Sequence, residues 1–166
     1  MIFRNIILGE NVQIDPSSSI NNVQIDDNVK IAKRVSIFGS PDNLAIIGKG
    51  CYIGMNTIIN GYAAPIVIGK YVSFAQNVNI MTDSGPNASS KLQKIFPLVS
   101  GKIKIGDNSW IGASSIIMPG VSLGRFCIVA ANSFVTNSFQ DYAVIGGTPA
   151  KLIRYLTPEE IKNIES

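Results

Sequence analysis

IGDNSW-IGASSI-IMPGVS-LGRFCI-VAANSF-VTNSFQ, residues 105–140, is the stretch that decides the fold of this chain. Each of its six-residue blocks begins with a branched aliphatic residue. Most of the fifth positions are small: Ser109, Ser115, Val121, Cys127, Ser133 and Phe139. A helix brings side chains to one face every 3.6 residues, so a strict period of six does not fit a helix. The period predicts short strands joined by tight corners, each strand pointing one aliphatic side chain inward.

The same frame runs upstream in groups of three blocks. The first positions of these groups are Leu8, Ile14, Ile20; Ile25, Ile31, Ile37; Ile47, Ile53, Ile59; and Ile68, Phe74, Ile80. With the downstream blocks this makes eighteen hexapeptides, or six turns of three strands. Longer or shorter steps separate the groups, and each break follows the third block of a turn. All insertions are therefore expected to leave one edge of a triangular prism, the arrangement that marks the functional side of a solenoid.

The repeat divides the chain into two parts. Residues 1–140 are expected to form the prism, with a loop at residues 82–102 that is too long for a simple corner and is therefore interpreted as functional. Residues 141–166 are expected to form an extended segment and a short helix. The helix start is indicated by Thr157 as N-cap, Pro158 in the first turn and Glu160 three residues after the cap.

Composition narrows the class of protein. The chain is 46% hydrophobic and only 15% charged, with a net charge of +3 spread over scattered Lys and Arg, so nucleic-acid binding is not indicated. No apolar run is long enough to span a membrane, and the first residues do not resemble a signal peptide. A cytosolic, soluble protein is expected. Cys51 and Cys127 cannot make a disulfide framework or a zinc site by themselves, and both are expected to be buried structural thiols.

Residues 103–154 carry a likeness to a known family through WIGA at 110–113, PGV at 119–121 and GGTPAKLIR at 146–154. The segment resembles the hexapeptide-repeat acyltransferases, in particular the galactoside, maltose and surface-polysaccharide O-acetyltransferases. The resemblance implies an all-β left-handed parallel β-helix of about six triangular turns. It also implies acetyl-CoA as co-substrate, no metal, and a homotrimer with sites between subunits. The apolar run LQKIFPLV at residues 92–99 is interpreted as the arm that packs on a neighbouring prism.

The resemblance assigns five residues to the cofactor. Ala113 and Ala131 are expected to offer backbone groups to the pantetheine arm of acetyl-CoA. Thr136, Lys151 and Arg154 are expected near its adenine and phosphate end. The two cations suit a phosphate, and the Arg154 guanidinium is expected to make a two-pronged contact with it.

Four further residues are candidates for binding the acceptor. Trp110, the only tryptophan, offers an indole face on which a sugar or pantetheine can stack. Asn79, Asn56 and Asn60 are candidates for holding sugar hydroxyls. Asparagine is also common at β-helix corners because it tolerates left-handed torsions, so each of the three has a structural alternative.

The chain contains no histidine, although the family's catalytic base is one. That histidine normally follows the strand that enters the long loop, and it often precedes a proline. In NVNIMTDSGPNASS, residues 77–90, alignment on Pro86 puts Gly85 or Ser84 in its place. A positioned base is worth roughly 10² to 10⁴ in rate. Without a histidine, the carboxylate nearest to this position is Asp83. Asp83 is therefore the candidate base, alone or through a relay with Ser84. The alternative is that Asp83 and Ser84, with Gly85 and Pro86, simply form a turn.

The residues leave three functions open. The leading hypothesis is an acetyl-CoA-dependent sugar O-acetyltransferase in surface-polysaccharide biosynthesis. The missing histidine favours an alternative, N-acetylation of an amino sugar or nucleotide-amino sugar, because a neutral amine is already nucleophilic. A non-catalytic β-helix scaffold is the third. The β-helical carbonic anhydrases, which bind zinc through histidines, are excluded by composition.

Overall fold

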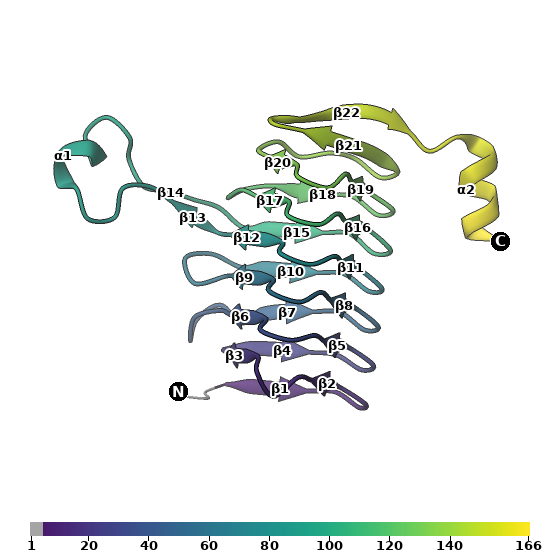
Figure 1. The fold of residues 1–166 in the computed structure, drawn as a ribbon, viewed down its shortest axis with the longest axis horizontal. Helices are drawn as coiled ribbons and strands as arrows, with labels where there is room; N and C mark the ends of the chain where they lie inside the picture. The colour runs from purple at the N-terminus through teal and green to yellow at the C-terminus, as the bar shows by residue number, and fades with distance from the viewer. Residues whose placement is uncertain (1–4) are drawn as a thin grey trace.

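In a computed structural model that describes residues 5–166, the chain winds into a three-sided stack of parallel strands (Figure 1). Face A comprises β1 (Ile6–Leu8), β4 (Val23–Ile25), β7 (Ala45–Ile47), β10 (Ile66–Ile68), β15 (Ile103–Ile105) and β18 (Ser122–Leu123). Face B begins with β2 (Gln13–Ile14), β5 (Lys30–Ile31), β8 (Tyr52–Ile53), β11 (Ser73–Phe74), β16 (Trp110–Ile111) and β19 (Ile128–Val129). Face C comprises β3 (Ser19–Asn21), β6 (Ser36–Phe38), β9 (Ile58–Asn60), β12 (Asn79–Met81), β17 (Ile116–Ile117) and β20 (Phe134–Val135). Successive strands pass from A to B to C, so the predicted six turns of a parallel β-helix are confirmed.

The inward aliphatic side chains form the core along the prism axis. On face B, Phe74 pairs in register with Ile53 below and Ile111 above, and all three are fully buried. Stacking like side chains in this way removes a continuous apolar column from water. Leu8 differs from the prediction: it is 49% exposed, because it lies in the first turn and β1 pairs only with β4.

The small fifth positions fit the tight corners. Ser109 and Ser115 are buried, and their hydroxyls donate to the backbone carbonyls of Gly124 and Ala130 at 3.0 Å. The thiols of Cys51 and Cys127 are buried and lie 3.1 Å from carbonyl oxygens. Burial raises the pKa of Cys51 to about 11 and also raises that of Cys127. The prediction of buried structural thiols is confirmed.

Two edges of the prism position the candidate site. The B–C edge consists of the corners at residues 15–18, 32–35, 54–57, 75–78, 112–115 and 130–133. The C–A edge contains the connections from face C to face A: residue 22 and residues 39–44, 61–65, 82–102, 118–121 and 136–138. Every long insertion leaves from the C–A edge, so the prediction of one insertion edge is confirmed.

The longest insertion projects from the prism as a hairpin (Figure 1). Its stem is the antiparallel pair β13 (Asp83–Ser84) and β14 (Val99–Ser100), and its tip carries the short helix α1 (Ser90–Gln93). The side chains of Ile95 and Phe96 beyond α1 are 71% and 63% exposed. The described chain therefore presents an apolar hairpin tip that nothing in the same chain covers.

The C-terminal segment closes the top of face B. β21 (Ala143–Gly147) adds parallel to β19, and β22 (Ala150–Tyr155) returns antiparallel to it. α2 (Pro158–Glu165) then begins at the expected N-cap, Thr157, with a complete capping box to Glu160. Tyr142 donates a hydrogen bond to Glu165 and so ties α2 to the prism. Neither helix in residues 5–166 has the length and apolar character needed to cross a membrane.

Candidate functional site

Three of the residues expected to hold the cofactor lie along the B–C edge. Ala113 and Ala131 occupy equivalent corner positions in adjacent turns, and the Ala113 carbonyl accepts from the backbone N–H of Asn132 at 2.8 Å. The β21–β22 hairpin tip is fastened to the same edge, because the Thr148 hydroxyl donates to the Asn132 carbonyl at 3.3 Å. Lys151 follows directly after this tip and is exposed. The edge thus offers small side chains, which leave the backbone accessible, with a lysine at its upper end.

Arg154 is engaged differently from what the sequence predicts. Its two terminal nitrogens bind both carboxylate oxygens of Glu160, at 2.6 Å and 3.0 Å. The guanidinium lowers the pKa of Glu160 to about 2, with a further contribution from the Thr157 backbone N–H. The two-pronged arrangement expected for a phosphate therefore exists here, but its occupant is a carboxylate of α2.

Thr136 lies apart from the other cofactor candidates. It follows β20 directly and is exposed in the corner that leads back to face A. That corner belongs to the C–A edge, whereas Ala131 lies at the start of the same face C strand, on the B–C edge. The structure therefore does not bring the five predicted cofactor residues together within one chain, because the prism places the two ends of each strand on different edges.

The two candidate catalytic residues lie at the mouth of the protruding hairpin, on the C–A edge. Asp83 and Ser84 form β13, opposite Ser100 and Val99, and both are half-buried. Thr82, just before them, is fully buried and donates its hydroxyl to the Asn60 carbonyl at 3.2 Å. These contacts fix the start of the hairpin on the turn below. The alternative of a turn over residues 83–86 is wrong for Asp83 and Ser84, because these two are a paired strand.

Gly85 has a backbone torsion that favours glycine. Its φ is +155°, and an added Cβ would lie 2.6 Å from Leu98 Cδ2 and 3.0 Å from Leu98 Cα. A side chain at this position would require Leu98 to shift and would hold a strained torsion. Of the two positions aligned with the family's histidine, Ser84 already carries a side chain in paired-strand geometry.

Trp110 lies on the outer side of face B and is 56% exposed. Its strand pairs with Ser73, and Ser73 pairs with Tyr52, so both aromatic residues occupy one outward row with a small residue between them. Tyr52 was not among the predicted residues. The signal is present in the sequence, because Tyr52 and Trp110 both occupy the sixth position of their blocks.

The three candidate asparagines are separated. Asn56 is a corner residue of the B–C edge with φ of +59°, and its amide donates to Asn77 and accepts from Arg34. Asn60 lies at the C–A edge, where its amide oxygen accepts from the Tyr62 backbone. Asn79 is half-buried on face C between them. Asn56 fits the structural alternative, because it is a corner residue with a left-handed torsion. Asn60 and Asn79 are strand residues, and both stay candidates for substrate binding.

The candidate residues therefore form two half-sites. The cofactor half, with Ala113, Ala131 and Lys151, follows the B–C edge; the loop half, with Asp83 and Ser84, follows the C–A edge. Face C separates the two edges by on the order of 15 Å at about 3.3 Å per residue. Within one described chain the two half-sites therefore do not meet.

Comparison with known proteins identifies relatives that match most of the chain. The family model described as hexapeptide repeat of succinyl-transferase matches residues 45–72 and 102–137. A putative acetyltransferase of Saccharomyces cerevisiae, YJL218W, is 34% identical over 151 residues, which cover 81% of this chain and 75% of the yeast protein. The galactoside O-acetyltransferase of Lactococcus lactis is 33% identical over 119 residues, 71% of this chain. The match spans only 56% of the Lactococcus protein.

A solved structure confirms the fold class. A variant of AntD, an N-acyltransferase from Bacillus cereus in complex with dTDP and coenzyme A, superposes with a TM-score of 0.83. The superposition covers 99% of this chain and 90% of AntD, at 23% sequence identity. Together with the parallel pairing on all three faces, this likeness identifies the prism as a left-handed β-helix.

Proposed function

Because this chain belongs to the hexapeptide-repeat acyltransferase family, we propose that it transfers an acetyl group from acetyl-CoA to a sugar hydroxyl. The yeast and Lactococcus relatives are both acetyltransferases by name, and the Lactococcus protein acts on galactosides. The observation that carries the proposal is the B–C edge, where the family-matched segment places Ala113 and Ala131 in adjacent turns beneath Lys151. A cytosolic step in surface-polysaccharide biosynthesis is the setting that we propose.

The B–C edge fits a long, thin donor. The side chains of Ala113 and Ala131 are small, so we propose that the pantetheine arm of acetyl-CoA lies over their backbone, where the Ala113 carbonyl already accepts from Asn132. Lys151 lies at the end where the phosphates of acetyl-CoA would be. Arg154 can add a two-pronged phosphate contact only when it exchanges Glu160 for the phosphate. Glu160 therefore holds the guanidinium in a suitable orientation and competes with the substrate for it.

The reaction requires a proton to move as the acceptor attacks. The acceptor oxygen adds to the thioester carbonyl, its proton leaves, and collapse of the tetrahedral intermediate releases the CoA thiolate, which takes up a proton. The side chain of Asp83 at the loop mouth is a carboxylate, which can accept a proton when it is ionised. We therefore assign Asp83 the role of base. Ser84, beside it in β13, is assigned to relay the proton when the acceptor does not reach Asp83 directly.

N-acetylation of an amino sugar is the second candidate function. The observation that favours it is the absence of histidine from the whole chain. A neutral amine attacks a thioester without prior removal of a proton, and the proton can leave afterwards. AntD, which shares the fold, is an N-acyltransferase.

The half-sites also support a homotrimer. Three prisms arranged about a threefold axis would set each C–A edge against the B–C edge of a neighbour. In such a closed ring every loop half-site would face a cofactor half-site. The exposed tip with Ile95 and Phe96 would then pack on the adjacent prism. This packing would bury apolar side chains that the single chain leaves in water.

Release of free thiol from acetyl-CoA, measured against a panel of hydroxyl sugars and amino sugars, tests the proposal. Asp83→Asn is expected to lower kcat on a hydroxyl acceptor by roughly 10² or more, the usual contribution of a positioned base. On an amino acceptor the same variant is expected to lose far less. Ser84→Ala is the matched variant. A smaller loss of kcat in Ser84→Ala than in Asp83→Asn would identify Ser84 as a relay and Asp83 as the base.

Two results would overturn parts of this account. Undiminished turnover of a hydroxyl sugar by Asp83→Asn would remove Asp83 as the base. Binding of acetyl-CoA without turnover on any acceptor would favour the scaffold over the enzyme. Thermal melting of each variant controls for loss of the fold.

A further inference from the structure

Tyr62 is an exposed aromatic residue next to the loop mouth. It belongs to residues 61–65, the insertion that connects β9 to β10 on the C–A edge. Its side chain is 65% exposed. Asp83 and Ser84 begin the next insertion on the same edge, one turn further along the prism. An exposed aromatic ring in the turn adjacent to the assigned base is a candidate for binding the acceptor.

We propose that Tyr62 orients the acceptor: its ring stacks on the apolar face of the sugar and holds the attacking group beside Asp83 and Ser84. The inference rests on the proposed acetyl transfer, and it adds a specificity-determining residue to that same site. The role of Tyr62 is to bind the acceptor, and the proton transfer stays with Asp83.

The register of face C places Tyr62 next to the assigned base. In the parallel pair of β9 and β12, Asn60 lies opposite Met81. Tyr62 and Asp83 each follow two residues after these partners. Adjacent strands lie about 4.8 Å apart, so the two segments leave face C side by side at the C–A edge.

The insertion is held in a fixed position against the loop mouth. The Thr82 backbone N–H donates to the Asn60 carbonyl at 3.0 Å, and the Ala64 N–H donates to the Thr82 hydroxyl oxygen at 3.3 Å. Both ends of the segment from residue 60 to residue 64 are thus fastened to the residue that precedes Asp83, and Tyr62 is at its centre. A loop that is fixed before the acceptor arrives loses little conformational entropy on binding.

Asn60 supplies a polar group beside the ring. Its amide oxygen accepts from the Tyr62 backbone N–H at 3.0 Å. This bond determines which way the amide points, and within residues 5–166 no hydrogen bond engages the amide nitrogen. That nitrogen can donate two hydrogen bonds. Asn60 therefore holds the loop through its oxygen and keeps its nitrogen for a hydroxyl of the acceptor.

These groups together suit a pyranose ring. A pyranose presents C–H bonds on its faces and hydroxyls around its rim. An aromatic ring covers such a face, while an amide and a carboxylate bind the rim. Stacking does not depend on whether the attacking group is a hydroxyl or an amine. The inference therefore applies to both candidate functions.

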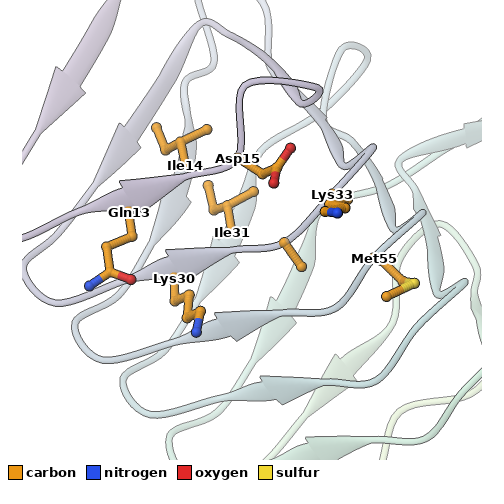
Figure 2. A pocket seen from close by; sticks show the side chains of 8 residues that line it. Gln13, Ile14, Asp15, Lys30, Ile31, Lys33 and Met55 are labelled. Atoms are coloured by element: carbon orange, nitrogen blue, oxygen red, sulfur yellow. The ribbon is translucent and has the colours of Figure 1, made fainter.

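A cavity on another edge is the rival place for the acceptor (Figure 2). This lysine-lined cavity, of about 400 Å³, lies at the lower end of the B–C edge, and its walls include Lys30, Lys33, Asp15 and Met55. It belongs to the first three turns, whereas Asp83 follows the fourth. The Met55 side chain is 43% exposed, so its truncation tests binding in the cavity.

Thiol release from acetyl-CoA, with methyl galactoside and galactosamine as acceptors, tests the inference. Tyr62→Ala is expected to raise the KM for the acceptor by about tenfold or more and to leave the KM for acetyl-CoA unchanged. The kcat is expected to fall by less than about threefold, because the lost contact is with the bound acceptor. Tyr62→Phe is expected to restore the parent KM, since it keeps the ring. Tyr71→Ala is the matched control, because its side chain is 54% exposed in the corner between faces A and B, outside both half-sites.

Each of four results would overturn the inference. The first is an unchanged acceptor KM in Tyr62→Ala, and the second is an equal rise in the KM for acetyl-CoA. The third is a rise in acceptor KM that is larger in Met55→Ala than in Tyr62→Ala, which would place the acceptor in the cavity. The fourth is a changed oligomeric state of Tyr62→Ala in size-exclusion chromatography, which would assign the ring to a subunit interface.

Saturation-transfer NMR separates this inference from the proposed function. The same two sugars are added to the parent chain without acetyl-CoA. Saturation transfer from aromatic protons to the sugar C–H protons, kept in Tyr71→Ala and lost in Tyr62→Ala, would support the inference even if no thiol is released. No transfer in the parent chain would overturn it, and thiol release in the same preparation would leave the acetyltransferase standing.

Discussion

Gly85 is the residue of the loop mouth whose backbone most disfavours a side chain. Its positive φ and its closeness to Leu98 mean that any added side chain would be strained, whereas the neighbouring Ser84 lies in a paired strand. An imidazole at residue 85 would therefore require Leu98 to move and the backbone to hold a disfavoured torsion.

Substitutions at the two positions are expected to differ in stability. Gly85→Ala should lower the melting temperature, because its Cβ would overlap Leu98 and the backbone would hold a disfavoured torsion. The cost expected for such a residue is of order 1–3 kcal/mol. Ser84→Ala in the same hairpin should change stability by less than about 0.5 kcal/mol. Equal melting temperatures for the two variants would contradict the geometry described for Gly85.

Among the elements, α2 depends at its first turn on one carboxylate, Glu160, while Glu165 accepts a hydrogen bond from Tyr142 in its last turn. Glu160 caps the first turn through the Thr157 backbone and pairs with Arg154. Its pKa falls from an ordinary 4.5 to about 2 in the folded chain. The stabilisation is therefore complete above pH 4.5 and is lost as the pH falls through about 2.

Glu160→Gln should reveal this contribution. At pH 7 the variant is expected to melt at a lower temperature than the parent chain. The difference should shrink as the pH falls from 4.5 towards 2 and should disappear below pH 2, where the parent's carboxylate is protonated as well. Because the pair is exposed to solvent, the effect is expected to be small and to shrink with added salt. A difference that does not change with pH would show that the charge of Glu160 does not stabilise the folded chain.

Substitutions in the core are expected to cost more in an inner turn than in the terminal turn. Phe74→Ala in β11 removes a fully buried ring stacked between Ile53 and Ile111, and it should cost about 3–5 kcal/mol in the free energy of unfolding. Leu8→Ala in β1 alters a residue that is 49% exposed and should cost under about 1 kcal/mol. Urea unfolding measures both. A similar loss for the two variants would contradict the difference between inner and terminal turns.

The elements were largely predictable from the sequence, and the site was not. A period of six with an aliphatic at each first position leaves a chain little choice but a three-sided stack, and the step lengths place each insertion on one edge. The start of α2 was predictable for a similar reason, because its capping box involves only Thr157 and Glu160, three residues apart in the sequence. The ion pair between Arg154 and Glu160 was not predictable in this way, because the charge pattern suits a phosphate as well as a carboxylate. Nor did spacing show that Thr136 and Ala131 lie on different edges, since that depends on which corner each one occupies.

In the whole molecule, one face of the prism separates the two halves of the candidate site. Asp83 and Ser84 lie on the C–A edge, whereas Ala113, Ala131 and the lysine-lined cavity lie on the B–C edge. A single chain therefore cannot apply its own loop residues to a donor on its own B–C edge. We therefore propose that function belongs to an assembly in which each site takes its two halves from different copies.

Mixing two blocked variants tests this central claim most directly. Ser84→Trp obstructs the loop mouth and Ala131→Trp obstructs the cofactor edge, both at positions that are not fully buried. Each variant alone should be folded, trimeric and inactive in acetyl-CoA thiol release. Refolded or co-expressed together in equal amounts, they should recover about one quarter of the parent activity, since one interface in four then pairs two unblocked halves. No recovery from mixed trimers would contradict the account and place both halves of the site within one chain.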